Sequence, residues 1–496
     1  MGSIRRTDNG ISFPPAVVVD VILDYLDLET IKALRLTNRA WGYLCLGPRF
    51  KSFVRHQTTN LTAKSLQSHM DLAYHPDLHP AVKTLTIVAD VYDPSLLKRV
   101  LHRRRCEDQT RMPRLTARDC TEDELDQARS DLEWLEDRSI ESRHVDEEDI
   151  GQTLAAVFNH FGQLDLIALE ATVTTAPRPD TFKSLGEWHI IWVKAAQVYR
   201  IVMSALAQSS IAVEGLSVYR ETIRCAVPSN EITGFMNNLD AKRWAFSPGQ
   251  SLKCLALDLS MRVDSNQERL ATERDQLERF ERETRRRWTG RLGTLQADLH
   301  PEAVSEENFP GVARLLQKMP NLESLVLSLR RTVKGDVRPY HRLFDAIADA
   351  VHLPLLGRLS LLGIYATSDS LVRFLQNHPT IRELYLEKVD LVSGSWEPVL
   401  RHIQEMPSLT RVILSRIAVA GKTVNLRPAE DTDIKSSLCD PDYFSCIWGV
   451  CVHRREFDAA AIREGFRFSQ HNQGPAEMSY AFTDFLVYDH EVYGLP

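Results

Sequence analysis

Three cysteines and a histidine near the end of the chain have the residue types that could bind a metal. They are Cys439, Cys446, Cys451 and His453. Structural zinc sites use two closely spaced ligand pairs, and here only Cys446 and Cys451, with four residues between them, have that spacing. Cys446 and Cys451 can equally be small buried hydrophobic residues beside Trp448. We therefore predict no metal site.

Sequence motifs for bond chemistry are missing. The sequence holds no G-x-G-x-x-G after a strand, no Walker A loop, no G-x-S-x-G elbow and no H-E-x-x-H. None of the eight cysteines stands in a setting typical of a thioester-forming residue. We predict a protein that binds rather than catalyses, without a cofactor.

Composition limits the possible partners and compartments. The 496 residues are 43% hydrophobic and 26% charged, with a net charge of −7, as in soluble globular proteins. A mild negative charge argues against nucleic-acid binding. No apolar run is long enough for a membrane span, and the proline pair at 14–15 interrupts any secretory signal. The cysteines are scattered, so we expect a soluble intracellular protein, in the cytoplasm or the nucleus.

The stretch 13–56 has the spacing of two or three short helices. Pro14 and Pro15 fit the first turn of a helix, and Gly47 with Pro48 closes the stretch. Between them, apolar residues recur on one helical face and then on a second: Val18, Val19, Ile22, Leu23, Leu26, Ile31, Leu34 and Leu36. Residues 1–12 are polar and predicted to be disordered.

This stretch resembles an F-box. The residues that carry the resemblance are Pro15, Val18, Val19, Ile22, Leu23, Leu26, Ile31, Leu34, Arg35 and Trp41. Val17 departs from the family pattern, which usually has an acid there, as do Phe13 and Pro14 in place of a leucine. The resemblance implies that these residues dock on the adaptor protein that links F-box proteins to a cullin. The other interpretation is a helical hairpin buried against its own domain.

A leucine pattern, L-x-x-L-x-L, recurs through most of the remaining chain. The clear copies begin at Leu322, Leu356, Ile381 and Leu409, 25 to 34 residues apart, and weaker copies begin at Val82, Leu164, Val213 and Leu252. Helical segments before three of these strands stop at Pro320, Pro379 and Pro407. The pattern resembles the irregular leucine-rich repeats of F-box proteins. It predicts an α/β solenoid, a horseshoe, over 57–437; a single copy can also be a core strand of another α/β fold.

Two charged segments and the carboxyl end differ from the repeats. We expect inserts at about 102–150 and 262–290, either partner-binding helices or solvated excursions. Residues 438–496 are rich in aromatic side chains and are predicted to cap the open end of the repeats.

Binding is therefore the expected activity. Alternate strand residues point away from the leucines, and five of them are candidates for binding a protein substrate on the concave face: Arg358, Glu383, Tyr385, Glu387 and Arg411. The resemblance implies a substrate-recruiting subunit of an SCF-type cullin–RING ubiquitin ligase. The alternatives are a leucine-rich-repeat interaction scaffold without a ligase role, and an F-box protein that binds the adaptor for another purpose.

Overall fold

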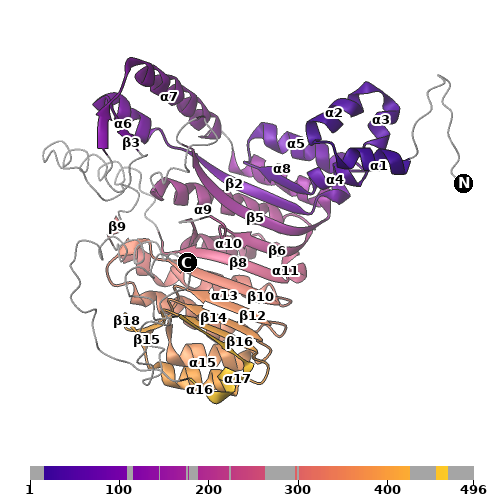
Figure 1. The fold of residues 1–496 in the computed structure, drawn as a ribbon. Coiled ribbons are helices and arrows are strands. Elements are labelled where there is room, and N and C mark those ends of the chain that lie inside the picture. The colour runs from indigo at the N-terminus through magenta and orange to yellow at the C-terminus, as the bar shows by residue number, and fades with distance from the viewer. Residues whose placement is uncertain are drawn as a thin grey trace, which may run out of the picture.

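A mixed α/β architecture with one large, mostly parallel sheet organises the chain (Figure 1). The computed structural model describes residues 16–108, 116–143, 146–174, 177, 188–222, 225–262, 297–298, 301–424 and 454–466. The predicted disordered segment 1–12 lies outside these residues.

The strands of the large sheet follow one another in chain order. Ten of its eleven strands form a continuous path, and β7 (Val227–Pro228) pairs beside β8. The path runs through β1 (His56–Thr59), β2 (Thr84–Tyr92), β5 (Gln163–Thr174), β6 (Ala212–Val218), β8 (Cys254–Ser260), β10 (Ser324–Arg330), β12 (Arg358–Leu362), β14 (Glu383–Glu387), β16 (Arg411–Ser415) and β19 (Arg454–Asp458).

The eight predicted strands are confirmed as strands, and they pair in a matching register. The middle leucine position of each copy lies beside the same position of the next: Leu85, Ile167, Leu216, Leu255, Leu325, Leu359, Leu384 and Val412. Each of these side chains is at most 2% exposed. The leucines therefore share one face of the sheet, as the period-two alternation of a strand requires.

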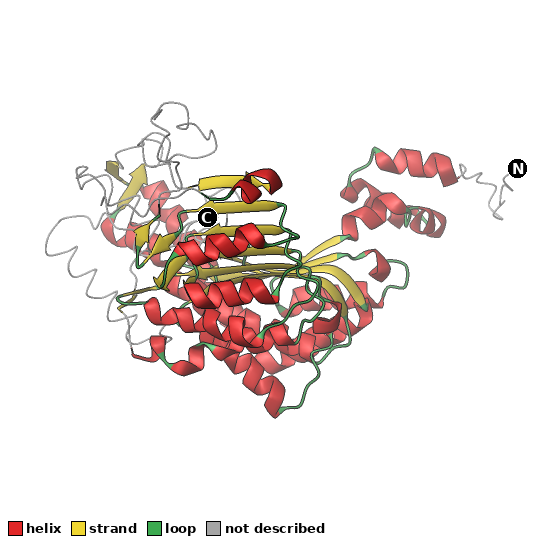
Figure 2. Ribbon diagram, turned by 90° about the horizontal axis from the view of Figure 1, so that it is seen from below, coloured by secondary structure: helices red, strands yellow, loops and turns green. Residues whose placement is uncertain are grey.

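Helices between successive strands cover that leucine face. They are α5 (Ala63–Tyr74), α8 (Glu147–Phe161), α9 (Trp188–Ala207), α10 (Ser229–Ala241), α11 (Pro248–Ser251), α13 (Pro310–Gln317), α14 (His341–Ala350), α15 (Ser368–Asn377) and α16 (Trp396–Glu405). Apart from the short α11, each packs beside its neighbours in the series, and Figure 2 shows helices gathered along one side of the sheet. Parallel strands need such crossovers because the chain must return to the same end of the sheet before the next strand can start. Helices α13, α15 and α16 end two or three residues before Pro320, Pro379 and Pro407, as predicted.

A second, smaller sheet follows the last three leucine strands. It contains β13 (Tyr365–Thr367), β15 (Asp390–Ser393), β17 (Ala418–Val419) and β18 (Lys422–Thr423). The turns into it carry Gly363, Lys388 and Arg416, with left-handed φ values of 66°, 51° and 50°. The sequence did not predict these short strands.

The first charged segment contains a long helix. After α6 (Ser95–Arg103), a hairpin of β3 (Arg105–Asp108) and β4 (Thr116–Asp119) leads into α7 (Glu122–Arg143). Leu125 and Leu135 of α7 are buried, and Lys98 of α6 pairs with Glu136 at 2.8 Å. Most other side chains of α7 are exposed, whereas α8, which begins inside the expected insert, belongs to the main core.

Cys120, directly after β4, is disulfide-bonded, which the scattered spacing of the cysteines did not predict. The second predicted insert lies outside the described residues from 263 onward.

Elsewhere, β9 (Ala297–Asp298) pairs with β11 (Val333–Lys334), and short 3₁₀ turns span His79–Ala81, Pro301–Val304, Glu306–Asn308 and Arg338–Tyr340.

A short strand and helix cover the last leucine strand. β19 pairs with β16 in the antiparallel direction and is followed by α17 (Ala459–Glu464). Phe457 and Ile462 are buried in the main core. These elements lie within the predicted cap, and the residues of 438–496 outside 454–466, including Cys439, Cys446, Cys451 and His453, lie outside the described part.

Candidate functional site

Four short helices precede the sheet: α1 (Ala16–Asp24), α2 (Leu28–Thr37), α3 (Arg39–Leu44) and α4 (Pro48–Val54). We call them the N-terminal helical unit. In Figures 1 and 2 the unit lies at one end of the sheet, beside the amino terminus.

Local capping sets the boundaries of these helices. The Asp27 carboxylate accepts a hydrogen bond from the Thr30 backbone N–H at 2.8 Å and starts α2. Hydrogen bonding from Thr30 also lowers the pKa of Asp27. The Asn38 side chain accepts from the Trp41 N–H at 2.9 Å and starts α3. Pro48 takes the first position of α4, where no N–H is needed.

The N-terminal helical unit has a hydrophobic core of its own. The buried members are Val19, Leu23, Ile31, Cys45, Phe50 and Leu78. Leu26, Leu34 and Trp41 are half-buried against them. The Arg35 guanidinium lies over the Phe50 ring, 4.2 Å from its centroid, a cation–π contact that closes one side. Because this core is separate from that of the sheet, the unit holds its shape largely through its own contacts.

The outer side of α1 is apolar and exposed. Val17, Val18, Val21, Ile22 and Tyr25 are 74%, 45%, 54%, 42% and 87% exposed. The spacing of Val17, Val18, Val21 and Ile22 puts them on one side of the helix, and Tyr25 follows directly after its last residue. We call these five residues the α1 apolar surface.

Exposed hydrophobic residues are concentrated in this unit. Leu36 on α2 and Tyr43 on α3 are 87% and 78% exposed. With the α1 apolar surface, seven of the ten large hydrophobic side chains exposed in the described ranges lie between Val17 and Tyr43. Single exposed apolar residues are ordinary, but a concentration of them marks an interaction site.

The structure divides the predicted adaptor-binding residues into two groups. Val18 and Ile22 lie on the α1 apolar surface, whereas Val19, Leu23 and Ile31 are at most 1% exposed inside the unit. The spacing predicted Val18, Val19, Ile22 and Leu23 on one helical face, but α1 is apolar on both sides and buries only Val19 and Leu23. Their contact with an adaptor stays a prediction. Pro15 lies outside the described residues.

Five exposed residues of the unit did not figure among the predicted contacts: Val17, Val21, Tyr25, Leu36 and Tyr43. The sequence held a signal for those on α1, since AVVVDVILD is apolar at nearly every position. A single core can cover only one side of such a helix.

The predicted substrate residues fall into three rows across neighbouring strands. Arg358, Glu383 and Arg411 lie side by side in one row, and all three are exposed. Arg411 also pairs with Glu456 of β19 at 2.7 Å, and that hydrogen bond raises the pKa of Arg411. These side chains form a stripe of alternating charge on the face opposite the leucines.

The other two predicted substrate residues are less accessible. The Tyr385 hydroxyl is half-buried and donates a hydrogen bond to Glu387, which is only 5% exposed. Glu387 is therefore not available as a surface contact in this structure. Lys388, directly after it, is half-buried, and the loss of solvent around its ammonium lowers its pKa to about 8.

A buried ion pair lies on the same face, toward the carboxyl ends of the strands. Arg330 Nη2 is 2.6 Å from the Asp258 carboxylate, and Arg220 is 3.9 Å from its other oxygen. Asp258 is fully buried, and that burial raises its pKa while Arg330 opposes the rise. The pair neutralises charge inside the protein.

Among the residues that the structure describes, no group of three or more His, Cys, Asp or Glu side chains could hold a metal ion. None of the described helices combines the length and apolar character needed to cross a lipid bilayer.

No protein-family model matches the chain, and no curated protein matches it. The fold and the candidate site define the protein only as a mixed α/β protein with a parallel sheet and an exposed apolar surface on its N-terminal helices.

Proposed function

We propose that the chain is a substrate-recruiting subunit of an SCF-type cullin–RING ubiquitin ligase. The N-terminal helical unit would be the F-box, docking on the adaptor that leads to the cullin. The strands and helices that follow would form an irregular leucine-rich-repeat horseshoe that holds a protein substrate. The single observation that carries the proposal is the α1 apolar surface, on a unit whose own core is complete without it.

The proposed role needs proximity rather than bond chemistry. A substrate held on the horseshoe would gain a high effective concentration near the charged conjugating enzyme. The charged stripe of Arg358, Glu383 and Arg411 is the proposed contact surface for that substrate.

The docking step is tested by a double substitution, Val18→Asp with Ile22→Asp. Both side chains are exposed, so the unit should keep its fold. Each apolar side chain buried against a partner contributes about 1.5–3 kcal/mol, so losing both should weaken docking by about a hundredfold or more. The measurement is co-purification of the adaptor with the full chain.

A matched control replaces two exposed apolar residues elsewhere, Ile140→Asp with Leu355→Asp, which are 52% and 53% exposed. The control should retain the adaptor. Undiminished adaptor recovery with the Val18→Asp, Ile22→Asp protein would refute the F-box assignment.

A second candidate function is an interaction scaffold in which the helices merely cap the sheet. The observation in its favour is that β1 begins two residues after α4 and pairs directly with β2. A scaffold would show no adaptor or cullin among proteins recovered with the full chain by affinity purification and mass spectrometry.

A further inference from the structure

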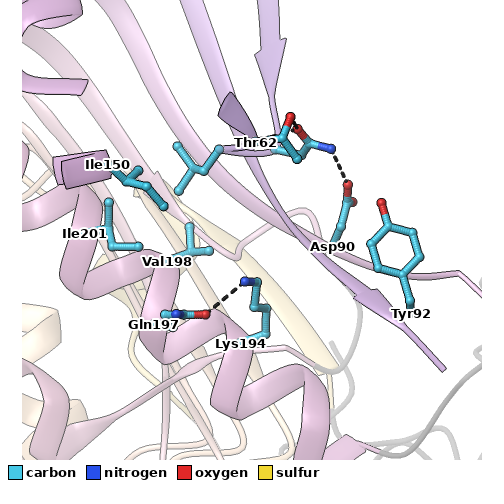
Figure 3. A pocket seen from close by; sticks show the side chains of 10 residues that line it. Thr62, Asp90, Tyr92, Ile150, Lys194, Gln197, Val198 and Ile201 are labelled. Atoms are coloured by element: carbon cyan, nitrogen blue, oxygen red, sulfur yellow. Dashed lines mark hydrogen bonds between the residues drawn. The ribbon is translucent and has the colours of Figure 1, made fainter. Parts of the chain in front are cut away.

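A groove runs along the end of the large sheet where its parallel strands begin. It is lined by residues at or close to the first residues of five neighbouring strands, β5, β6, β8, β10 and β12. Its volume is about 420 Å³, within the range of about 300–1,000 Å³ that ligand sites usually have. The hollow between β2 and α9 in Figure 3, by contrast, has about 20 Å³, which is room for about one water molecule.

The groove has the length of a short extended peptide. Neighbouring strands lie about 4.8 Å apart, so the five strands span about 19 Å. An extended chain rises about 3.3 Å per residue, and about six residues therefore cover that distance. A long groove that is open to solvent fits a chain segment better than a compact small molecule, which a protein usually encloses on most sides.

The walls of the groove offer hydrogen-bond donors and acceptors together. Gln163 and Gln250 are exposed, and neither side chain has a hydrogen-bond partner in the part of the chain that the structure describes. The Asn321 side-chain NH₂ group donates to the Gln250 carbonyl at 2.7 Å, which fixes the orientation of this third amide. Each side-chain amide can both donate and accept, as a peptide backbone requires of its partner.

One carboxylate of the groove is available to a ligand. Glu214 and Lys253 pair with each other at 3.2 Å. Glu323, just before β10, is exposed, and within the described residues no hydrogen bond or ion pair involves its carboxylate. Its backbone is held in place, because its N–H donates to the Lys253 carbonyl at 2.8 Å. The lining residues therefore carry one excess negative charge, which is complementary to a basic side chain.

An exposed leucine lines the groove at the next strand. Leu355, in the turn before β12, is 53% exposed. The turn lies next to Glu323, because the Gly357 N–H donates to the Glu323 carbonyl at 2.8 Å. Alternate side chains of an extended peptide point to the same side. A basic residue and an apolar residue two positions apart can therefore contact Glu323 and Leu355 at the same time.

We propose that this groove binds an extended peptide segment of a partner protein, in which a lysine or arginine pairs with Glu323 and an apolar residue two positions away packs on Leu355. The groove adjoins the charged stripe, since the Glu323 carbonyl also accepts a hydrogen bond from the Arg358 N–H at 3.0 Å. It lies at the same end of the strands as the N-terminal helical unit, which leads into β1 (Figures 1 and 2). Naming the partner as the ligase substrate rests on the proposed function, whereas peptide binding itself does not.

The first test selects peptides from a phage-displayed library of random hexapeptides, with the full chain as the bait. The selected peptides should be enriched in a basic residue two positions from an aliphatic one. Reversing the charge with Glu323→Lys should change this preference from a basic to an acidic residue. A library that yields no binding peptide, or peptides without a basic residue, would overturn the proposal.

The second test measures the affinity of one selected peptide by fluorescence polarisation. Glu323→Gln should weaken binding about fivefold, the upper range for an exposed ion pair, and Leu355→Asp about tenfold. Glu405→Gln, at an exposed position of α16, should leave the affinity unchanged. Binding that survives both groove substitutions would place the peptide elsewhere and overturn the proposal.

Folding and the ligase function are checked separately. Both substituted side chains are exposed, so the variants should keep the wild-type melting curve by circular dichroism, and if one does not, the other decides. Adaptor recovery should be unchanged in Glu323→Lys, because the α1 apolar surface is intact. Adaptor loss in the Val18→Asp, Ile22→Asp protein with peptide binding retained is the expected converse, so the failure of one proposal is distinguishable from the failure of the other.

Discussion

His378 uses both ring nitrogens in the interior. Its Nε2 accepts a hydrogen bond from the Leu353 backbone N–H at 3.0 Å, so the ring proton must be on Nδ1. Nδ1–H donates to the Phe374 carbonyl at 2.6 Å, and the side chain is 1% exposed. These bonds tie the end of α15 to the chain that leads into β12, but only while the ring is neutral.

Protonation of His378 should therefore weaken the fold. Burial lowers its pKa below the ordinary 6.5, with smaller effects from Phe374 and the neighbouring His352 ring. Because the unfolded chain takes up this proton more readily, the contribution to stability is present above pH 6.5 and is lost as the pH falls below it.

Urea unfolding should show a loss of stability from this residue between pH 7.5 and 5.5, of at most about 1 kcal/mol. His378→Gln should be less stable at pH 7.5 but lose less on acidification. His56→Gln, at an exposed position, should follow the wild-type pH dependence. An unchanged pH dependence in His378→Gln would contradict this role.

At the scale of elements, three equivalent turns carry the chain from the large sheet to the small one. The Gly363 N–H donates to the Glu387 carbonyl and the Lys388 N–H to the Ser415 carbonyl, both at 2.8 Å. The same position of each turn thus has a left-handed conformation, and in the first two turns its N–H makes the same hydrogen bond to the next strand. Lys388 and Arg416 adopt this conformation with a side chain, at a cost of about 1 kcal/mol each.

Gly363 is constrained by a close backbone atom in addition to its left-handed φ, which is not so at Gly421. A Cβ atom there would lie 2.5 Å from the Leu329 carbonyl oxygen, whereas at Gly421, also left-handed at φ 79°, nothing lies within 4 Å. Gly421→Ala should therefore cost about 1–2 kcal/mol, from backbone strain alone. Gly363→Ala should cost more, by about 1–3 kcal/mol, from the added clash.

Unfolding of the two variants in urea compares these costs directly. The difference between them isolates the contact with the Leu329 carbonyl, since both replace a left-handed glycine with alanine. Equal destabilisation would show that the backbone moves away from Leu329 at little cost.

Elements with strong periodicity were predictable from the sequence, and elements set by tertiary context were not. Leu359 and Leu384 mark β12 and β14 because the alternation reports burial on one face. The sequence RREFD of β19 has no such alternation, and this strand forms because β16 offers a free edge. Glu387 was predicted to lie on the face opposite the leucines, and it does. It is nevertheless buried there, because side-chain alternation does not report which groups cover a residue.

The candidate docking site, too, was predictable from the sequence only in part. Helical spacing located the apolar residues of α1, since Val18, Val19, Ile22 and Leu23 all fit a helix. It could not say which pair faces inward, because packing of Ile31 and Phe50 against one side decides that.

At the scale of the whole molecule, the two hydrophobic cores are joined by few residues. Leu72 of α5 touches both cores, and Leu78 packs into the core of the N-terminal helical unit from the loop that follows α5. The backbone continues from α4 into β1, where the Arg55 carbonyl accepts hydrogen bonds from the Lys83 and Thr84 N–H groups at 2.8 and 3.0 Å. The boundary between the unit and the sheet thus falls between Val54 and Arg55.

Deleting residues 1–54 should therefore leave the sheet folded. The deletion exposes parts of Leu72 and Leu78, which costs about 1–3 kcal/mol, but it keeps Arg55 and all of β1. Deleting residues 1–60 also removes β1, exposes the β2 edge and leaves Thr84 without its partner, so it should lower the melting temperature further. Thermal melting followed by circular dichroism compares both truncated chains with the full one. A small effect of the first deletion is what a tethered docking unit requires; a loss as large as that of the second would mean that these helices serve the sheet as its cap.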